Sequence, residues 1–174
     1  MQSNDYAALA VLRLERAREL LIEAEDLLKN EHYKSANNRA YYVIEKSINA
    51  LLAIDGVMTK THKGCLLLFN KLYVRTGKGG FSQEDYKQAA KAEEIRSVSD
   101  YDDFYIANKK ETREIVEFAG SFYKRVDEYI ELVFLEAIAN KRKDSPTIPF
   151  EDIVKESGFT MDELRKLADE VEIE

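Results

Sequence analysis

Three short segments of this 174-residue chain carry side chains whose types and spacing could do chemistry. In the first, Asn38, Tyr42 and Glu45 recur at offsets of four and seven residues, which places them on one face of a helix. A polar stripe of this kind is usually a solvated helix face. The alternative is the wall of a cleft, in which these side chains meet residues of another helix.

The second segment, residues 56–83, holds five basic side chains and no acidic one. Lys60 and Lys63 flank His62 at the expected start of a helix, where backbone N–H groups could hold a phosphate. An ordinary basic surface is the simpler explanation of the same residues. A lone histidine is also more often a capping or surface residue than a ligand or catalyst.

The third segment is Arg96-Ser97-Val98-Ser99-Asp100-Tyr101-Asp102-Asp103, in which an arginine at an expected helix end precedes a tyrosine and three carboxylates. Asp100 or Asp102 could cap the next turn or pair with Arg96, which would be a purely structural role. In a chemical role, Arg96, Asp100, Tyr101 and Asp102 are the candidate catalytic residues.

Metal chemistry is not expected. The soft ligands His32, His62 and Cys65 do not have the spacing of a zinc site. The aspartates after Arg96 lack the central glycine and terminal glutamate of a calcium loop, and support for a magnesium site is weak. No P-loop, dinucleotide fingerprint or nucleophile elbow is present, so we expect no cofactor.

The hydrophobic pattern predicts the elements that must position these segments. Apolar residues recur at intervals of three and four, and no stretch alternates with a period of two. The expected fold class is all-α, an up-and-down bundle of four to five long helices with a short helical C-terminal appendage. The helices are expected over residues 4–29, 33–54, 61–76, 82–97 and 111–141. On the last helix, a second set of apolar residues fits either a broad core face or a dimer interface: Phe118, Tyr123, Ile130, Phe134 and Ile138.

Charge and proline content predict two domains. Residues 1–143 hold 23 basic and 23 acidic side chains and no proline, whereas residues 144–174 hold 3 basic and 10 acidic ones and both prolines. We therefore expect a bundle over 1–143 and an acidic helical tail over 144–174. The acidity of the tail argues against sequence-specific DNA binding. The tail either packs its apolar residues on the bundle or covers a basic face of its own or a partner chain.

Composition also predicts where the protein works. The chain has one cysteine, no run of eighteen apolar residues and no signal-peptide pattern at its start. These features favour a cytoplasmic protein without membrane association.

Taken in order, the segments resemble a HEPN domain over roughly residues 5–140. The resemblance rests on three runs: Asn38-Arg39-Ala40-Tyr41-Tyr42-Val43-Ile44-Glu45, Thr59-Lys60-Thr61-His62-Lys63-Gly64 before Leu66, and Arg96-Ser97-Val98-Ser99-Asp100-Tyr101-Asp102. It implies a homodimer, and in many members a ribonuclease or a toxin paired with a minimal nucleotidyltransferase. In active members a histidine follows the arginine after four to six residues, and here those positions hold Tyr101, Asp102 and Asp103. The chain is thus similar to the subfamily without that histidine. We expect no ribonuclease activity of the usual kind, because a phenol with a pKa of about 10 is a poor proton shuttle at neutral pH.

The resemblance implies an RNA- or nucleotide-binding module. Arg96 would clamp a phosphate, Tyr101 or Tyr42 would stack on a base, and Glu45 would bond a base edge or ribose. The remaining expected ligand-binding residues are Asn38, Lys60, His62 and Lys63. A nucleotidyltransferase partner could modify a tyrosine near this motif, which makes Tyr101 and Tyr105 candidate acceptors.

Two alternatives stay open. One is a metal-independent ribonuclease toxin with an altered motif, using Arg96, Tyr101 and Asp100 or Asp102, with His62 contributed from elsewhere in the cleft. The other is a protein–protein interaction module without a nucleic-acid ligand.

Overall fold

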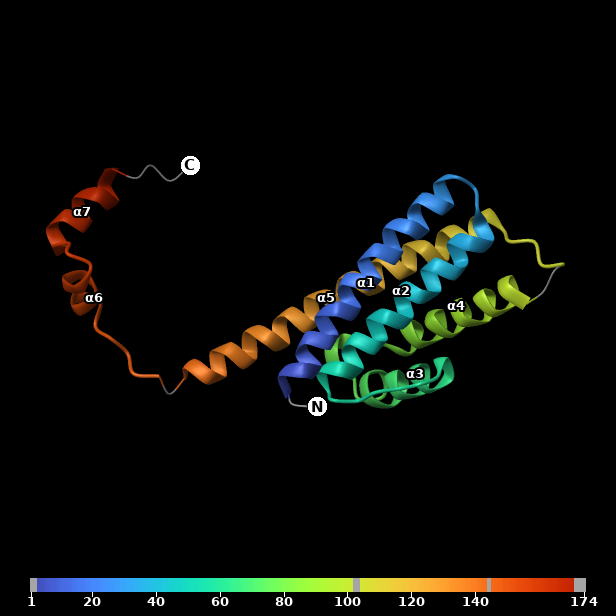
Figure 1. Ribbon diagram of the computed structural model, residues 1–174, viewed down its shortest axis with the longest axis horizontal. Helices are drawn as coiled ribbons and strands as arrows, with labels where there is room; N and C mark the ends of the chain where they lie inside the picture. The colour runs from blue at the N-terminus through green and yellow to red at the C-terminus, as the bar shows by residue number, and fades with distance from the viewer. Residues whose placement is uncertain (1–2, 102–103, 144, 171–174) are drawn as a thin grey trace. The chain divides into compact units, whose positions relative to one another are not determined.

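Four long helices form the bundle of this protein. The computed structural model describes residues 3–101, 104–143 and 145–170, and over these ranges it contains helices and turns but no strand. Successive long helices run in opposite directions, so the chain passes up and down the bundle (Figure 1). The expected all-α fold is therefore confirmed. The long helices are α1 (Ser3–Lys29), α2 (Tyr33–Ile54), α4 (Gln83–Tyr101) and α5 (Lys109–Arg142).

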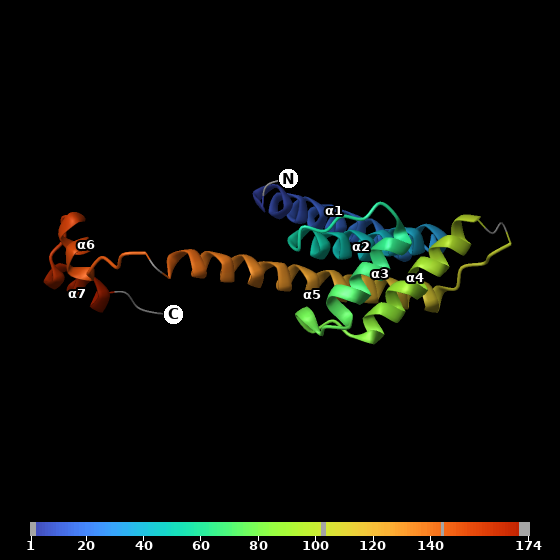
Figure 2. The same cartoon turned by 90° about the horizontal axis from the view of Figure 1, so that it is seen from below.

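A short helical segment connects α2 to α4. The helix α3 (His62–Phe69) continues into a π-helical turn, η1 (Asn70–Val74), and then into a 3₁₀ turn, η2 (Lys78–Gly80). The Thr61 hydroxyl accepts a hydrogen bond from the backbone N–H of Gly64 at 3.0 Å, so Thr61 is the N-cap of α3. The single helix expected over 61–76 is thus divided. Figures 1 and 2 show α3 beside α4.

Helix α4 begins with a capping box formed by Ser82 and Asp85, and it is longer than expected. The Asp85 carboxylate accepts from the backbone and hydroxyl of Ser82 at 2.8 and 2.9 Å. It also accepts two hydrogen bonds from Arg125 of α5. The helix ends at Tyr101 rather than near residue 97, because neither glycine nor proline interrupts the segment. Arg96 therefore lies inside a helix and not at its end.

The core is built around α2, which contacts α1, α3 and α4. Its residues Ile44, Ile48 and Leu51 are completely or almost completely buried. A second part of the core is aromatic, with the Phe122 ring of α5 5.6 Å from Phe69 and 5.7 Å from Phe81. Of the second apolar set on α5, one residue is buried and three pack partly buried against the core, which supports the broad core face for these four: Ile130, Phe118, Tyr123 and Phe134.

The chain divides into two compact units, residues 1–134 and 135–174. The second unit contains the end of α5 together with α6 (Phe150–Glu156) and α7 (Met161–Glu170). Thr160 caps α7, because its hydroxyl accepts from the backbone N–H of Glu163 at 3.3 Å, and Val154 of α6 is 3% exposed. The boundary expected between residues 143 and 144 remains a prediction.

Candidate functional site

The polar stripe on α2 is not simply a solvated helix face. The Glu45 side chain is only 11% exposed, and Tyr42 is half-buried. Both residues face groups contributed by α3 and α4, because α2 is covered by these helices. Tyr42 and Glu45 thus meet residues of other helices, which is the arrangement that the second of the two interpretations of the sequence requires.

His62 is anchored to Glu45 at the start of α3. The Thr61 cap fixes the first turn of this helix, and the His62 Nδ1 atom lies 2.7 Å from Oε1 of Glu45 and 2.9 Å from the hydroxyl of Tyr41. An ionised carboxylate only accepts hydrogen bonds, so this contact places a proton on Nδ1. When the ring is uncharged, Nε2 is then its acceptor. The side chain of His62 is 42% exposed, which leaves the ring accessible to a ligand.

Arg96 of α4 lies against two adjacent tyrosines of α2. Its Nη2 atom donates to the Tyr42 hydroxyl at 2.9 Å, and its Cζ atom lies 5.8 Å and 5.5 Å from the ring centroids of Tyr41 and Tyr42. The two tyrosine rings meet edge to face at 5.4 Å. Arg96, Tyr41, Tyr42, Glu45 and His62 therefore form one cluster, which we call the Arg96 cluster.

Tyr41 is a member of the cluster that the sequence interpretation missed. It is 2% exposed and belongs to the core, yet its hydroxyl reaches His62. Burial raises the pKa of the Tyr41 phenol, with a further contribution from the negative charge of Glu45, so the hydroxyl stays protonated at neutral pH. The signal was present, because residues four positions apart share a helix face and Tyr41 precedes Glu45 by four.

Arg13 of α1 contacts the segments on both sides of the Glu45–His62 contact. Its Nη1 atom donates to the backbone carbonyl of Asn49 at 2.6 Å, and Nη2 lies 3.4 Å from the sulfur of Met58. The Asn49 side chain in turn donates to the backbone carbonyl of Glu45 at 3.0 Å. Arg13 thus ties the Glu45 turn of α2 to the loop that leads to His62.

The other predicted binding residues lie apart from the cluster. Lys60 and Lys63 are exposed, and within the described part of the chain neither forms a hydrogen bond or an ion pair with a member of the cluster. Lys78, from the same basic segment, forms an ion pair of 2.6 Å with Asp55, which is a structural contact of the bundle. Asn38 lines a separate polar pocket, together with Ser99 and three neighbours on α2.

The residues that follow Arg96 are only partly described. The backbone of Asp100 and Tyr101 completes the last turn of α4, whereas their side chains and all of Asp102 lie outside the described part of the structure. The Tyr105 ring is half-buried, and Lys34 Nζ lies 5.9 Å from its centroid. Burial raises the pKa of Tyr105, with a further contribution from Glu111.

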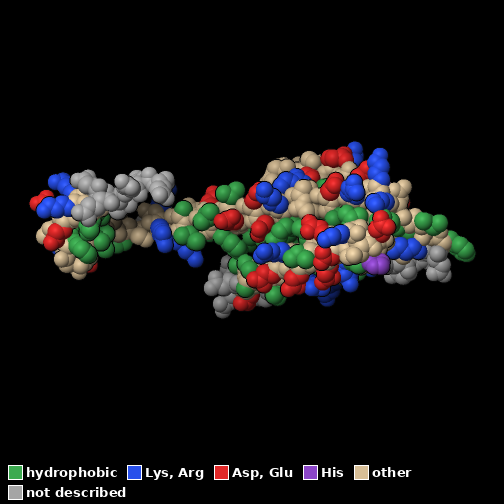
Figure 3. All heavy atoms as spheres, turned by 90° about the horizontal axis from the view of Figure 1, so that it is seen from above, with side chains coloured by type: hydrophobic (Ala, Val, Ile, Leu, Met, Phe, Trp, Pro, Cys, Tyr) green, Lys and Arg blue, Asp and Glu red, His purple; other side chains and the backbone are tan. Residues whose placement is uncertain are grey.

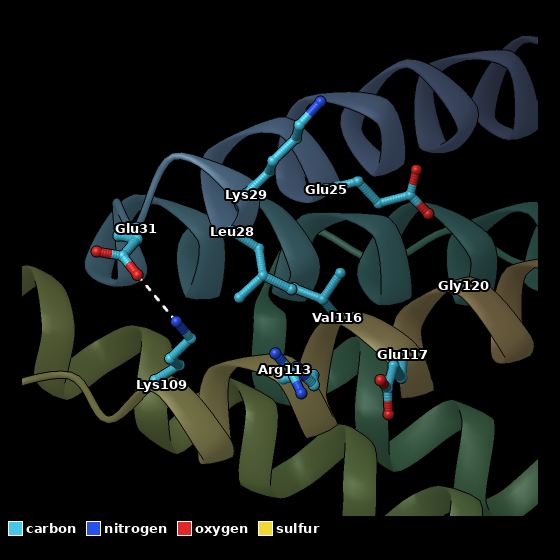
Figure 4. A pocket seen from close by; sticks show the side chains of 9 residues that line it. All are labelled: Glu25, Leu28, Lys29, Glu31, Lys109, Arg113, Val116, Glu117 and Gly120. Atoms are coloured by element: carbon cyan, nitrogen blue, oxygen red, sulfur yellow. Dashed lines mark hydrogen bonds and ion pairs between the residues drawn. The ribbon is translucent and has the colours of Figure 1, made fainter.

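A different cavity, of about 420 Å³, lies between α1 and the first half of α5 (Figure 4). An ion pair of 2.8 Å between Lys109 and Glu31 spans one end of it. It contains none of the predicted functional residues. Its charged lining is balanced, with three acidic and three basic side chains: Glu25, Glu31, Glu117, Lys29, Lys109 and Arg113.

On the face of the bundle drawn in Figure 3, acidic and basic side chains are interspersed, so no field of a single sign covers it. No group of three His, Cys, Asp or Glu side chains within the described ranges could hold a metal ion. None of the helices described is long and apolar enough to span a membrane.

Comparison with known proteins identifies the family. The model of the HEPN domain matches residues 10–129. A chain of Thermotoga maritima named "UPF0332 protein" is 34% identical over 116 residues, which cover 67% of this chain and 86% of the relative. A chain of Methanocaldococcus jannaschii named "Putative toxin MJ0142" is 26% identical over 117 residues, covering 67% of this chain and 78% of the relative. The Arg96 cluster lies within the matched region, and the chain belongs to the HEPN family.

Proposed function

We propose that this HEPN chain binds RNA or a nucleotide, with Arg96 as the group that contacts phosphate. The observation that carries the proposal is the fixed position of the Arg96 guanidinium, which Tyr42 holds by a 2.9 Å hydrogen bond and two tyrosine rings flank. Guanidinium groups bind phosphate oxygens through paired N–H donors, and a group held in place loses less conformational freedom on binding.

The neighbouring groups suit the rest of a nucleotide. Tyr42 and His62 are partly exposed aromatic rings whose centroids lie 6.2 Å apart, and a base can stack on such rings. Glu45 is mostly buried, and its negative charge is engaged by His62, so it opposes phosphate binding less than an exposed carboxylate would. In this proposal Tyr101, whose side chain the structure does not describe, is a further stacking candidate.

A second candidate function is metal-independent RNA cleavage with His62 as the general base. The contact of 2.7 Å between His62 and Glu45 favours it, because Glu45 fixes the tautomer that leaves Nε2 able to accept a proton. Nε2 would take the proton of a ribose 2′-hydroxyl, and the 2′-oxygen would attack the adjacent phosphorus. The bond from phosphorus to the 5′-oxygen would break, and that oxygen would take a proton from water. Arg96 would stabilise the charge that develops on the phosphoryl oxygens.

The proposal includes partners. We propose a homodimer that pairs with a minimal nucleotidyltransferase in a toxin–antitoxin-like setting, with Tyr101 and Tyr105 as candidate sites of modification. Support comes from family membership and from the word "toxin" in the names of two Methanocaldococcus relatives. Size-exclusion chromatography tests the dimer, and co-purification with the product of an adjacent nucleotidyltransferase gene tests the pairing.

One gel tests binding and cleavage together. The full chain, Arg96→Ala, His62→Ala and the control Arg75→Ala are incubated with RNA, with and without EDTA. Arg75 is exposed and belongs to the basic segment but not to the Arg96 cluster. A shift that weakens only in Arg96→Ala and His62→Ala supports the binding proposal. Cleavage that needs both residues and tolerates EDTA supports the ribonuclease. The absence of any shift or cleavage contradicts both and favours a protein ligand.

A further inference from the structure

A polar pocket lies one helical turn from Arg96 along the groove between α2 and α4. It has a volume of about 310 Å³. Every side chain that lines it carries an N–H or O–H donor, and none is a carboxylate. The lining residues are Lys34, Ser35, Asn38 and Arg39 of α2 and Ser99 of α4, and we call this site the Lys34 pocket.

The charges around the Lys34 pocket favour an anion. The Nε atom of Arg39 is held by Glu23 of α1 at 2.7 Å, and its Nη1 atom donates to Oδ1 of Asn38 at 3.2 Å. Among the side chains that the structure describes here, Lys34 and Arg39 against Glu23 give one net positive charge. The pocket also lies in the first two turns of α2, and the first turn contains no acidic residue, so the helix dipole adds to the positive potential. The balanced α1–α5 cavity has no such excess.

The spacing relates the Lys34 pocket to the Arg96 cluster. Asn38 precedes Tyr42 by four residues, about 6 Å along α2, and Ser99 follows Arg96 by three residues, about 4.5 Å along α4. Because α2 and α4 run in opposite directions, both steps lead the same way along the groove. The separation of one helical turn is comparable with that of neighbouring phosphates along an extended strand.

We propose that the Lys34 pocket binds a second phosphoryl group, next to the one that contacts Arg96. This inference rests on the proposed function of Arg96 and names its substrate class, a ligand with at least two successive phosphoryl groups. Such a ligand is either a single-stranded oligoribonucleotide or a nucleoside diphosphate. A nucleoside monophosphate would fill only one of the two sites.

The test compares three ligands and three variants of the full chain. Fluorescence competition measures binding of hexauridylate, UDP and UMP to the wild type, Lys34→Gln, Arg96→Ala and the control Arg113→Gln. Arg113 is an exposed cation of the same unit that lines the α1–α5 cavity instead. Each phosphate contact on a single strand contributes a salt slope of about 0.7, so it adds about a 2.6-fold loss of affinity between 50 and 200 mM salt.

For hexauridylate, the loss of affinity between 50 and 200 mM salt should be about 2.6-fold smaller in Lys34→Gln than in the wild type. For UMP, and in Arg113→Gln, the salt dependence should equal that of the wild type. If Lys34→Gln shows the same reduced salt dependence with UDP, the pocket accepts a terminal diphosphate. If the reduction occurs only with hexauridylate, the pocket binds a phosphodiester. If Arg96→Ala weakens hexauridylate binding and Lys34→Gln matches the wild type, the second site is wrong and the proposed function stands. If Arg96→Ala has no effect either, the proposed function fails and the second site fails with it.

Discussion

Replacing Tyr42 by phenylalanine removes one oxygen atom from the Arg96 cluster and keeps the aromatic ring. The lost atom is the acceptor of the 2.9 Å hydrogen bond from Arg96 Nη2. The ring contact of 5.5 Å between the guanidinium and residue 42 survives the substitution. The variant therefore separates the fixing of Arg96 from the stacking surface offered to a base.

The expected magnitude follows from the burial of the pair. A hydrogen bond to a charged group contributes about 1.5–3 kcal/mol when it is buried. Arg96 and Tyr42 are both half-buried, so water replaces part of the lost interaction. Binding that relies on a fixed Arg96 should weaken by about 0.5–1.5 kcal/mol, or about 2- to 12-fold in Kd.

Fluorescence anisotropy with a labelled single-stranded RNA measures this change. The matched control is Tyr86→Phe, because Tyr86 lies on the same helix as Arg96 and packs partly buried against the core. Circular dichroism checks that both variants keep the wild-type helix content. A Kd for Tyr42→Phe equal to that of the control would refute the claim that Tyr42 prepares Arg96 for phosphate.

Three further predictions concern stability and reactivity. Asp85→Asn should lower the free energy of unfolding at pH 7 by about 1–3 kcal/mol, because Asp85 accepts hydrogen bonds from Arg125 and from the N-cap of α4. Burial alone would raise the Asp85 pKa, but these hydrogen bonds lower it. The contribution of Asp85 to stability is therefore complete above about pH 4 and is lost as the pH falls further. Urea titrations from pH 3 to 7 that show the same pH dependence in variant and wild type would contradict this. Tyr73→Phe should cost about 0.5–1.5 kcal/mol, because its buried hydroxyl donates to a backbone carbonyl of α2 at 2.7 Å; an unchanged urea midpoint would count against it. Burial raises the pKa of the Cys65 thiol to about 12, so a maleimide should label it only on unfolding, and rapid labelling of the native protein would contradict its burial.

The fold could be predicted because its signals are local. Thr61 and Ser82 cap helices that begin where the sequence predicts them, at residues 61 and 82, since each cap depends on residues within three positions of it. The π-helical turn after Phe69 was missed, because it alters hydrogen bonding without a glycine or proline to mark it. The extension of α4 to Tyr101 was missed because its serines prefer helix ends.

The site could be predicted only in part, because its contacts are distant in sequence. Arg96 meets Tyr42 across 54 residues, and Arg13 meets Asn49 across 36. Residue types singled out Arg96, Tyr42, Glu45 and His62 as separate candidates, and the packing of α2 against α3 and α4 brings them together. Tyr41 was not singled out, because its position on α2 fits the core as well as the site.

A crystal structure of the full chain with hexauridylate tests the central claim most directly. The account predicts a phosphate oxygen within about 2.7–3.2 Å of the Arg96 guanidinium, with Tyr42 or His62 against the adjoining nucleoside. RNA bound on the basic segment around Lys60 and Lys63, with Arg96 still turned only toward its tyrosines, would contradict it.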